Sequence, residues 1–347
     1  MLLKQLLKNL DYTLVQGCLN TEVTDIYYDS RKVTPGGLFV CIVGTQRDSH
    51  DYAADVAAKG AAVLAIQHDL PAEVLAALPD VTVVKFESTR YAMALLSTAY
   101  FGRPALEMTM VGVTGTKGKT TTTHMIKAVL EAAGHKVGMV GTNGVYYPGH
   151  HYDLNNTTPE SYELQKILRQ LADAGCDACV MEVSSQGIMM DRVAGIHYKV
   201  GVFTNLYPDH IGPGEHSSFE EYRSWKGKLF PNTEALLEGH TCKLVTYGIH
   251  APKVDYRASE QYRLLRNKEM LGVEFTLTEP DGHTLDVQVG MPGLFSIYNA
   301  LATIGVGKVL GLADAPIHEG LKKALVKGRV ELVPISHKFT ILIDYAH

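Results

Sequence analysis

A glycine-rich segment at residues 114–120, which reads TGTKGKT, has the residue types and spacing of a phosphate-binding loop. Its glycines let successive backbone N–H groups converge on phosphate oxygens, and the N-terminus of a following helix adds partial positive charge. In such a loop Lys119 would reach the terminal phosphates, and the Thr120 hydroxyl would ligate Mg²⁺. The strict spelling of the motif fails at Val113, where its first glycine belongs. The loop predicts a bound nucleotide without naming the reaction, since hydrolases, kinases and ligases all use it.

The segments beside this loop have the pattern that it requires. Residues 108–113 form an apolar run, which predicts a buried strand. After the loop, apolar side chains recur on one helical face and the pattern stops at Gly134, which predicts a helix. A further helix is expected to start at residues 158–160, where a threonine cap precedes a proline at the first helical position. Apolar runs at residues 178–183 and 200–204 predict two more strands.

The whole chain alternates short apolar runs with amphipathic segments, which is typical of an α/β fold. We expect a small N-terminal α/β domain over residues 1–104. A central domain of the phosphate-loop type, with a mainly parallel sheet, would follow over residues 105–334. Residues 273–278 and 285–289 alternate apolar and polar side chains on either side of a turn. This hairpin pattern predicts a small antiparallel β insert within the central domain.

Composition excludes several classes of partner. Hydrophobic residues make up 46% of the 347 residues, charged residues make up 20%, and the formal net charge is -5. These values are ordinary for a globular protein, and Lys and Arg do not gather into a long run, so a nucleic-acid surface is disfavoured. No apolar run approaches the roughly 18 residues of a membrane span. We therefore expect neither nucleic acid nor membrane as a partner.

Five scattered cysteines argue against a disulfide framework and favour a reducing cytoplasm. Cys176 and Cys179 spell C-x-x-C, but no second pair completes a zinc site. Because free cysteine packs as a small hydrophobic residue, we expect both side chains to be buried, inert thiols.

Further motifs accompany the phosphate loop in a fixed order. They are Asp29-Ser30-Arg31, Asn156-Thr157-Thr158-Pro159-Glu160, Met181-Glu182-Val183-Ser184-Ser185, Asp191-Arg192-Val193, Phe203-Thr204-Asn205-Leu206, Asp209-His210, Tyr222 with Lys226, Tyr298-Asn299-Ala300, Gly328-Arg329-Val330-Glu331 and Asp344-Tyr345-Ala346-His347. Over nearly the whole chain, this series resembles the Mur ligases, which act on UDP-N-acetylmuramoyl peptides. The resemblance is strongest to the members that add the third residue, a diamino acid.

The resemblance implies a nucleotide site that extends beyond the loop. Asn299 would hydrogen-bond adenine, Asp344 would hydrogen-bond the ribose, and Arg329 would face the phosphates, where a planar guanidinium suits paired oxygens. The residues expected to bind ATP are Gly115, Thr116, Lys117, Gly118, Lys119, Thr120, Thr121, Asn299, Arg329 and Asp344.

The resemblance also implies two Mg²⁺ sites and a site for the UDP-linked substrate. Thr120 and Glu182 would hold the first ion, whereas His210 and a carbamylated Lys226 would hold the second. Burial would lower the pKa of this lysine and favour the neutral amine that CO₂ modifies, although Lys228 is a rival candidate. The expected catalytic residues are Lys119, Lys226 and His210. The UDP-linked muramoyl peptide would be held by Ser30 at its uridine end and by Asn156, Thr157, Thr158, Ser184 and Arg192.

The chemistry implied by the resemblance is amide formation in two steps. A substrate carboxylate attacks the γ-phosphate of ATP and gives an acyl phosphate, and an incoming amine then displaces phosphate. Catalysis would rest on positioning and electrostatics, with ATP and Mg²⁺ as cofactors. The expected partners are a UDP-linked muramoyl peptide and a free amino acid, in a cytoplasmic protein that we expect to be a monomer.

Several positions depart from the family pattern. Gln186 stands where the family usually has histidine, Trp225 stands where a small residue is usual, and the wording of residues 211–216 differs. Family members carry a third domain after the last motif. Residues 335–347 are therefore expected to be the start of a truncated C-terminal ligase domain, and we expect this chain to bind the UDP-linked dipeptide without forming the tripeptide.

Two alternatives stay open from the sequence. One is another ligase of the same fold, of the folylpolyglutamate or cyanophycin type, which uridine-nucleotide binding would distinguish. The other is a non-catalytic nucleotide-binding module. ATP turnover in the presence of the UDP-linked peptide would distinguish that alternative.

Overall fold

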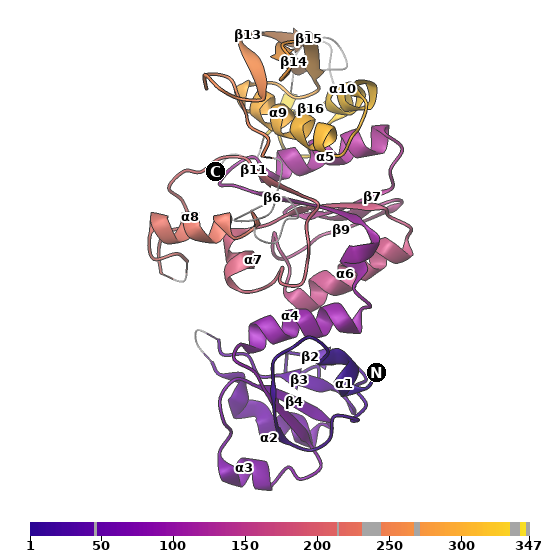
Figure 1. Ribbon diagram of the computed structural model, residues 1–347, viewed down its shortest axis with the longest axis vertical. Helices are drawn as coiled ribbons and strands as arrows, with labels where there is room; N and C mark the ends of the chain where they lie inside the picture. Colours follow the sequence, from indigo (N-terminus) through magenta and orange to yellow (C-terminus); the bar gives the residue numbers. More distant parts are fainter. Residues whose placement is uncertain (45–46, 214, 231–243, 267–270, 334–340, 345–347) are drawn as a thin grey trace. The chain divides into compact units, whose positions relative to one another are not determined.

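The computed structural model describes residues 1–44, 47–213, 215–230, 244–266, 271–333 and 341–344. The chain forms two compact units (Figure 1). The first unit comprises residues 1–104 together with two later segments, 159–170 and 189–196. The second unit comprises residues 105–158, 171–188 and 197–347.

A five-stranded sheet of order β1-β5-β4-β3-β2 is the centre of the first unit. The strands are β1 (Thr13–Gln16), β2 (Ile26–Tyr27), β3 (Leu38–Val40), β4 (Val63–Ile66) and β5 (Thr82–Lys85). The neighbouring pairs among β2 to β5 are parallel, whereas β1 runs antiparallel to β5 at one edge. The unit therefore has the parallel sheet that α/β sequences predict.

Alternate residues of these strands enter two separate hydrophobic cores, one on each face of the sheet. Leu38 and Val63 belong to one core, whereas Phe39 and Leu64 belong to the other. This separation follows from the two-residue period of a strand. Helices α1 (Leu3–Leu6) and α4 (Thr89–Tyr100) contribute to the first core, and α2 (Ala53–Ala58) and α3 (Ala72–Ala76) pack against the second. Both faces of the sheet are thus covered.

A six-stranded sheet of order β11-β6-β10-β7-β8-β9 forms the centre of the second unit. Its parallel strands are β6 (Thr109–Thr114), β7 (Val137–Gly141), β10 (Ala178–Glu182) and β11 (Val200–Phe203). An antiparallel hairpin of β8 (Gly144–Tyr147) and β9 (His150–Tyr152) extends one edge. Because β6 lies between β10 and β11, the ends of these three strands meet beside the predicted phosphate loop.

Two long helices cover one face of this sheet. Helix α5 (Lys119–Ala132) contributes Ile126 and Leu130 to the core over the sheet, and α9 (Leu294–Val309) contributes Ala302 and Val306. The opposite face of α5 places Met125 and Val129 in a second core. Helix α5 is therefore held on two sides.

A small antiparallel sheet packs around that second core, with α9 and α10 (Asp314–Lys323) beside it (Figure 1). Its order is β12-β13-β14-β15, with β12 at Tyr247–Gly248, β13 at Tyr256–Arg266, β14 at Leu271–Thr278 and β15 at Thr284–Val289. Strands β14 and β15 form the hairpin that the alternating pattern predicts. The structure confirms the mixed α/β class with mainly parallel sheets and a small antiparallel insert.

Three shorter helices and a two-stranded ladder complete the structure. The helices are α6 (Ser161–Asp173), α7 (Ser185–Met189) and α8 (Phe219–Gly227), and short 3-10 turns lie at Ser49–Tyr52 and Pro104–Glu107. Strands β16 (Glu331–Val333) and β17 (Ile341–Ile343) pair antiparallel near the end of the described chain. In the described residues, no helix has the length and apolar character needed to cross a membrane.

One helix start was predicted wrongly. Helix α6 begins at Ser161, so Thr158 is not its cap. The Thr158 hydroxyl instead donates to the Glu182 carbonyl and accepts from the Ser184 N–H. A threonine hydroxyl can satisfy backbone groups outside a helix, and here that alternative prevails.

The cysteine prediction is confirmed where the structure describes it. Cys176 and Cys179 are buried and free, as is Cys41. Burial raises the pKa of the Cys41 thiol to about 12 and the pKa of Cys179 further still, which makes both thiols unreactive. Cys242 lies outside the described residues.

Candidate functional site

The phosphate loop lies between the end of β6 and the start of α5, as its sequence predicts. Two of its glycines are required by geometry. Gly115 has a φ of 140° and Gly118 has a φ of 83°. A Cβ atom would lie 2.0 Å from the Thr204 hydroxyl at Gly115 and 2.6 Å from the Asn299 side-chain oxygen at Gly118. No L side chain fits either position without displacing its neighbour.

The segment after β11 holds the phosphate loop in shape. The side chain of Asn205 accepts from the Lys117 N–H at 2.8 Å and donates to the Lys117 carbonyl at 3.0 Å. The Asn205 carbonyl accepts from the Thr116 N–H at 3.0 Å, and the Thr204 hydroxyl donates to the Lys117 carbonyl at 2.7 Å. These bonds fix the loop backbone before any ligand binds.

Lys119 occupies the first position of α5 and folds back over the loop. Its Nζ donates to the carbonyls of Gly115 at 2.9 Å and Thr116 at 3.1 Å. Burial lowers the pKa of this amine, and the nearby Glu182 carboxylate opposes that effect. Phosphate oxygens would be stronger acceptors than these carbonyls, so the ammonium group is placed to exchange one for the other.

A buried carboxylate faces the start of α5 from the neighbouring strand. Glu182 ends β10 and is 1% exposed. It accepts hydrogen bonds from the Thr120 hydroxyl at 3.1 Å and from the Thr142 N–H at 2.9 Å and hydroxyl at 3.2 Å. Burial raises the pKa of this carboxyl group, and the hydrogen bonds partly offset the rise. The structure thus brings together the two residues expected to hold the first metal ion.

A second cluster surrounds the fully buried ring of Tyr222 on α8. The Lys226 Nζ lies 4.5 Å from the centre of this ring, and the His210 ring centre lies 6.0 Å from it. The Tyr222 hydroxyl donates to the Thr116 hydroxyl of the phosphate loop at 3.0 Å. His210 has a φ of 56°, and its Nδ1 lies 3.0 Å from a Glu215 carboxylate oxygen. Tyr222 therefore connects the phosphate loop with both residues expected at the second metal site.

Lys226 is the buried lysine of this cluster, whereas Lys228 is exposed and lies over the Trp225 ring. The Lys226 Nζ donates to the Gly115 carbonyl at 3.0 Å. Burial, with a smaller effect of Lys119, lowers the pKa of Lys226 to about 7. A substantial fraction of this amine is therefore neutral near pH 7, which is the form that can react with CO₂.

The other residues expected at the nucleotide have mixed placements. Asn299 lies on α9 and its side-chain oxygen accepts from the Thr122 hydroxyl at 3.3 Å, so it faces the start of α5. Thr121 is buried in the first turn of α5. Asp344 is exposed and accepts from the Val330 N–H at 3.2 Å, next to Arg329 in sequence. The adenine and ribose roles of these residues stay predictions.

The residues expected at the UDP-linked substrate divide between the two units. In the second unit, the Thr157 and Thr142 hydroxyls lie 2.9 Å apart, and Thr158 bridges Glu182 and Ser184. Asn156 is exposed beside them. The Thr157 contact joins this group to the carboxylate site, since Thr142 also bonds Glu182.

In the first unit, Ser30 follows a local ion pair between Asp29 and Arg31 at 2.8 Å, and its carbonyl accepts from Lys59. Arg192 pairs with Glu160 at 2.6 Å, so its guanidinium already has one anionic partner. The expected contacts of Ser30 and Arg192 with substrate stay predictions.

A further group of metal-capable side chains, which the sequence did not predict, lies in the first unit at Asp48, His50 and His68. The Gln67 N–H donates to Nε2 of His50 at 2.9 Å, so the ring proton is on Nδ1, which faces Asp48. The His68 Nε2 bonds the other Asp48 oxygen at 2.7 Å, and the two rings stack with centres 3.7 Å apart. With its proton on Nδ1, His50 does not offer that nitrogen to a metal, so the group acts as a hydrogen-bonded network.

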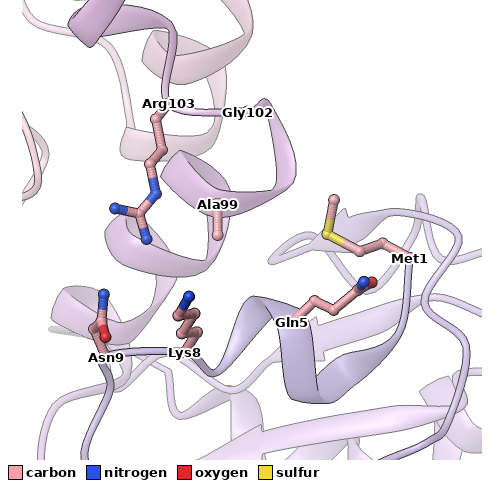
Figure 2. Close-up of a pocket in the computed structure, with 7 residues that line it drawn as sticks. All are labelled: Met1, Gln5, Lys8, Asn9, Ala99, Gly102 and Arg103. Carbon is pink, nitrogen blue, oxygen red and sulfur yellow. The ribbon is translucent and has the colours of Figure 1, made fainter.

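A pocket of about 420 Å³ in the first unit is lined by none of the expected site residues. It lies between the N-terminal segment and the end of α4, as Figure 2 shows. The nitrogen-bearing ends of Lys8, Asn9 and Arg103 are turned toward the same space (Figure 2). These three side chains are exposed and in solvent.

Four contributors to the site received no role from the sequence. Thr204, Asn205 and Tyr222 were recognised only as parts of motifs, and His216 only as part of a divergent loop. The position of residues 204–205 just after a strand gave the usable signal, because parallel strand ends converge. The roles of Tyr222 and His216 depend on packing between α8 and the loop, which the local sequence does not reveal.

Comparison with known proteins identifies the family. Residues 113–307 match the Mur ligase middle domain, and residues 22–100 match the Mur ligase family, catalytic domain. The chain is 36% identical over 366 residues to UDP-N-acetylmuramoyl-L-alanyl-D-glutamate--2,6-diaminopimelate ligase of Clostridium perfringens (strain 13 / Type A). That alignment covers 100% of this chain and 72% of the relative.

Solved structures agree with this assignment at the level of the fold. A structure of UDP-N-acetylmuramoyl-L-alanyl-D-glutamate--2,6-diaminopimelate ligase has a TM-score of 0.79 at 19% identity, covering 100% of this chain and 71% of that one. MurF from Thermotoga maritima, in complex with ADP, has a TM-score of 0.59 at 18% identity, covering 90% of this chain and 68% of that one. The domain matches and the sequence identity together show that this chain belongs to the Mur ligase family of ATP-dependent, amide-forming ligases.

Proposed function

We propose that this chain ligates an amino acid, a diamino acid, to UDP-N-acetylmuramoyl-L-alanyl-D-glutamate in peptidoglycan precursor synthesis. The observation that carries the proposal is the buried Glu182 carboxylate bonded to Thr120 at the start of α5, directly beside the phosphate loop. The relatives that share the whole length of this chain are named for that substrate and for 2,6-diaminopimelate. The folylpolyglutamate alternative is supported only by neighbours of lower structural similarity, with a TM-score of 0.58.

The oxygen atoms at Thr120 and Glu182 suit a magnesium ion. Mg²⁺ prefers hard oxygen ligands, usually one or two carboxylates together with substrate phosphates. The hydroxyl and the carboxylate lie 3.1 Å apart and are buried at the place where phosphates would lie. These two residues would hold the first ion. When bound, Mg²⁺ would neutralise negative charge on the phosphate oxygens.

The second proposed site fits a metal ion only after Lys226 is modified. As an amine, Lys226 donates a hydrogen bond to Gly115 and offers no oxygen ligand. In the proposed modification the neutral Nζ attacks the carbon of CO₂ and loses a proton to solvent, which gives a carbamate anion. With His210, the carbamate would supply an oxygen and a nitrogen ligand to a second Mg²⁺. The pKa of about 7 supports this site because it provides the neutral amine.

The residues of this chain would act mainly by positioning and by charge. The backbone N–H groups of the loop and the Lys119 ammonium would bind the phosphates of ATP. The terminal carboxylate of the substrate would attack the γ-phosphorus and release ADP, which leaves an acyl phosphate. The amine of the amino acid would then attack the acyl carbon, lose a proton and expel inorganic phosphate. The described side chains need supply no nucleophile for either step.

Trapping of the acyl phosphate tests the proposal. The chain is incubated with ATP, Mg²⁺ and UDP-N-acetylmuramoyl-L-alanyl-D-glutamate, and hydroxylamine replaces the amino acid. We expect a hydroxamate of the UDP-linked substrate that requires both ATP and Mg²⁺. Matched reactions contain folate with glutamate. ATP consumption that depends on folate, or ATP consumption that ignores both substrates, would contradict the proposal.

We also propose that the protein works in the cytoplasm. The free thiols of Cys18, Cys41, Cys176 and Cys179 support a reducing compartment. The monomeric state stays a prediction.

A further inference from the structure

His216 is a fully buried histidine in the loop that leads into α8. Its backbone is fixed on both sides, since its N–H donates to the His210 carbonyl at 3.1 Å and its carbonyl accepts from the Gly212 N–H at 3.1 Å. The side chain is 0% exposed. A histidine buried in this way has given up its hydration, so its ring contacts must be specific if they are to offset that loss.

The ring of His216 contacts two different parts of the second unit. Its Nε2 lies 2.9 Å from the Ser185 hydroxyl. Its ring centre lies 5.2 Å from that of Tyr222, which in turn donates to Thr116 of the phosphate loop. Burial lowers the pKa of the imidazole, so the ring is neutral near pH 7 and can donate only one N–H. Among the described residues, its Nδ1 is buried without a hydrogen-bond partner.

Ser185 belongs to the turn that carries the expected substrate residues. It is the first residue of α7, and Ser184 just before it accepts from the Gly187 N–H at 2.9 Å. The Ser184 N–H donates to the Thr158 hydroxyl at 3.1 Å, and Thr158 donates to the Glu182 carbonyl. A shift of Ser185 would therefore be passed to Ser184 and Thr158 through short, directional bonds.

We propose that His216 is a positioning residue that fixes the Ser184–Ser185 turn for the UDP-linked substrate. It joins that turn to Tyr222 and so to the phosphate loop. The inference rests on the proposed function, because it assumes that the UDP-linked muramoyl peptide binds at Thr158 and Ser184. His216 itself is not a catalytic residue, since Ser185 lies between it and the expected ligand contacts.

The test is a double-mutant cycle on substrate affinity. His216→Phe keeps an aromatic ring against Tyr222 but removes the bond to Ser185, whereas Ser185→Ala removes the same bond from the other side. His216→Gln keeps a polar group able to reach Ser185. Titration calorimetry measures the affinity of each folded variant for UDP-N-acetylmuramoyl-L-alanyl-D-glutamate, and separately for a non-hydrolysable ATP analogue with Mg²⁺.

We expect His216→Phe to weaken the affinity for the UDP-linked peptide by about three- to tenfold, the loss expected for one hydrogen bond. Adding Ser185→Ala should cause little further loss, because both changes remove one interaction. His216→Gln should recover most of the affinity, and binding of the ATP analogue should change less than twofold or so. A purely structural role would weaken both ligands together.

Three results would overturn the inference. They are unchanged substrate affinity in His216→Phe, fully additive losses in the double mutant, and equal losses for substrate and nucleotide. Failure of the unmodified chain to bind the UDP-linked peptide would overturn the proposed function and this inference with it. If His216→Phe does not fold, His216→Gln and Ser185→Ala decide between the same outcomes.

Discussion

Lys226 is a buried amine whose removal should stabilise the metal-free protein. It is 1% exposed, and its Nζ bonds only a carbonyl and lies over the Tyr222 ring. Burial lowers its pKa from 10.5 to about 7. At about 1.4 kcal/mol for each tenfold change in proton affinity, the protonated side chain costs about 5 kcal/mol of folding free energy at about pH 6.

The cost should shrink as the pH rises. Between the folded and unfolded pKa values the unfolded chain binds one proton more than the folded chain, so the free energy of unfolding increases with pH. At about pH 9 the folded amine is neutral and the remaining cost is about 2 kcal/mol. Methionine has a similar length and no charge, so Lys226→Met should be more stable than the unmodified chain by up to about 5 kcal/mol at about pH 6. This advantage should fall by about 3 kcal/mol by about pH 9.

Urea unfolding followed by the fluorescence of Trp225 measures this difference. Trp225 is the only tryptophan in the chain and is adjacent to Lys226. The buffers should contain neither Mg²⁺ nor bicarbonate, so that the amine stays unmodified. Lys228→Met is the matched control, since Lys228 is exposed and should give a stability difference that does not vary with pH. A difference between Lys226→Met and the unmodified chain that is constant with pH, or a loss of stability at both pH values, would refute the reasoning.

Three further predictions concern the phosphate loop. Gly118→Ala should destabilise the fold and weaken ATP binding more than Gly134→Ala, because both glycines have a φ above 80° but only Gly118 has a neighbour, Asn299, within 4 Å of a new Cβ atom. Urea unfolding of the two variants should differ by about 1–3 kcal/mol. Glu182→Gln should fold, lose about tenfold or more in Mg²⁺-dependent nucleotide affinity by calorimetry, and lack the stability that the metal-free chain gains as the pH falls through the raised pKa of Glu182. Tyr222→Phe, which keeps the ring but loses the bond to Thr116, should cost about 1 kcal/mol in the same unfolding assay.

The features that the sequence predicted are those with a local cause. The phosphate loop, the strand before it and α5 follow from glycine spacing and apolar periodicity within residues 108–134. Glu182 was placed beside the loop because it ends a strand, and parallel strands end at the same edge of a sheet. The hairpin of β14 and β15 was visible because one face of each strand is buried and its residues alternate.

Features that depend on distant packing were not predicted. Strand β13 is mostly exposed, so its sequence lacks the alternation that marks a half-buried strand. The Thr158 hydroxyl bonds residues far along the chain instead of capping α6, and local cap rules cannot foresee that competition. His216 and Tyr222 acquire their contacts only when α8 packs against the loop. The clamp by Asn205 likewise joins residues 88 positions apart in sequence.

The central claim is that the phosphate loop binds ATP for ligation to a UDP-linked muramoyl peptide. The most direct test is calorimetric titration of a non-hydrolysable ATP analogue with Mg²⁺ into the chain saturated with UDP-N-acetylmuramoyl-L-alanyl-D-glutamate. We expect the unmodified chain to bind the nucleotide, and folded Lys119→Ala to bind it about 10- to 100-fold more weakly, because a charged hydrogen-bond donor is lost. No binding by the unmodified chain, or equal affinity in folded Lys119→Ala, would contradict the claim.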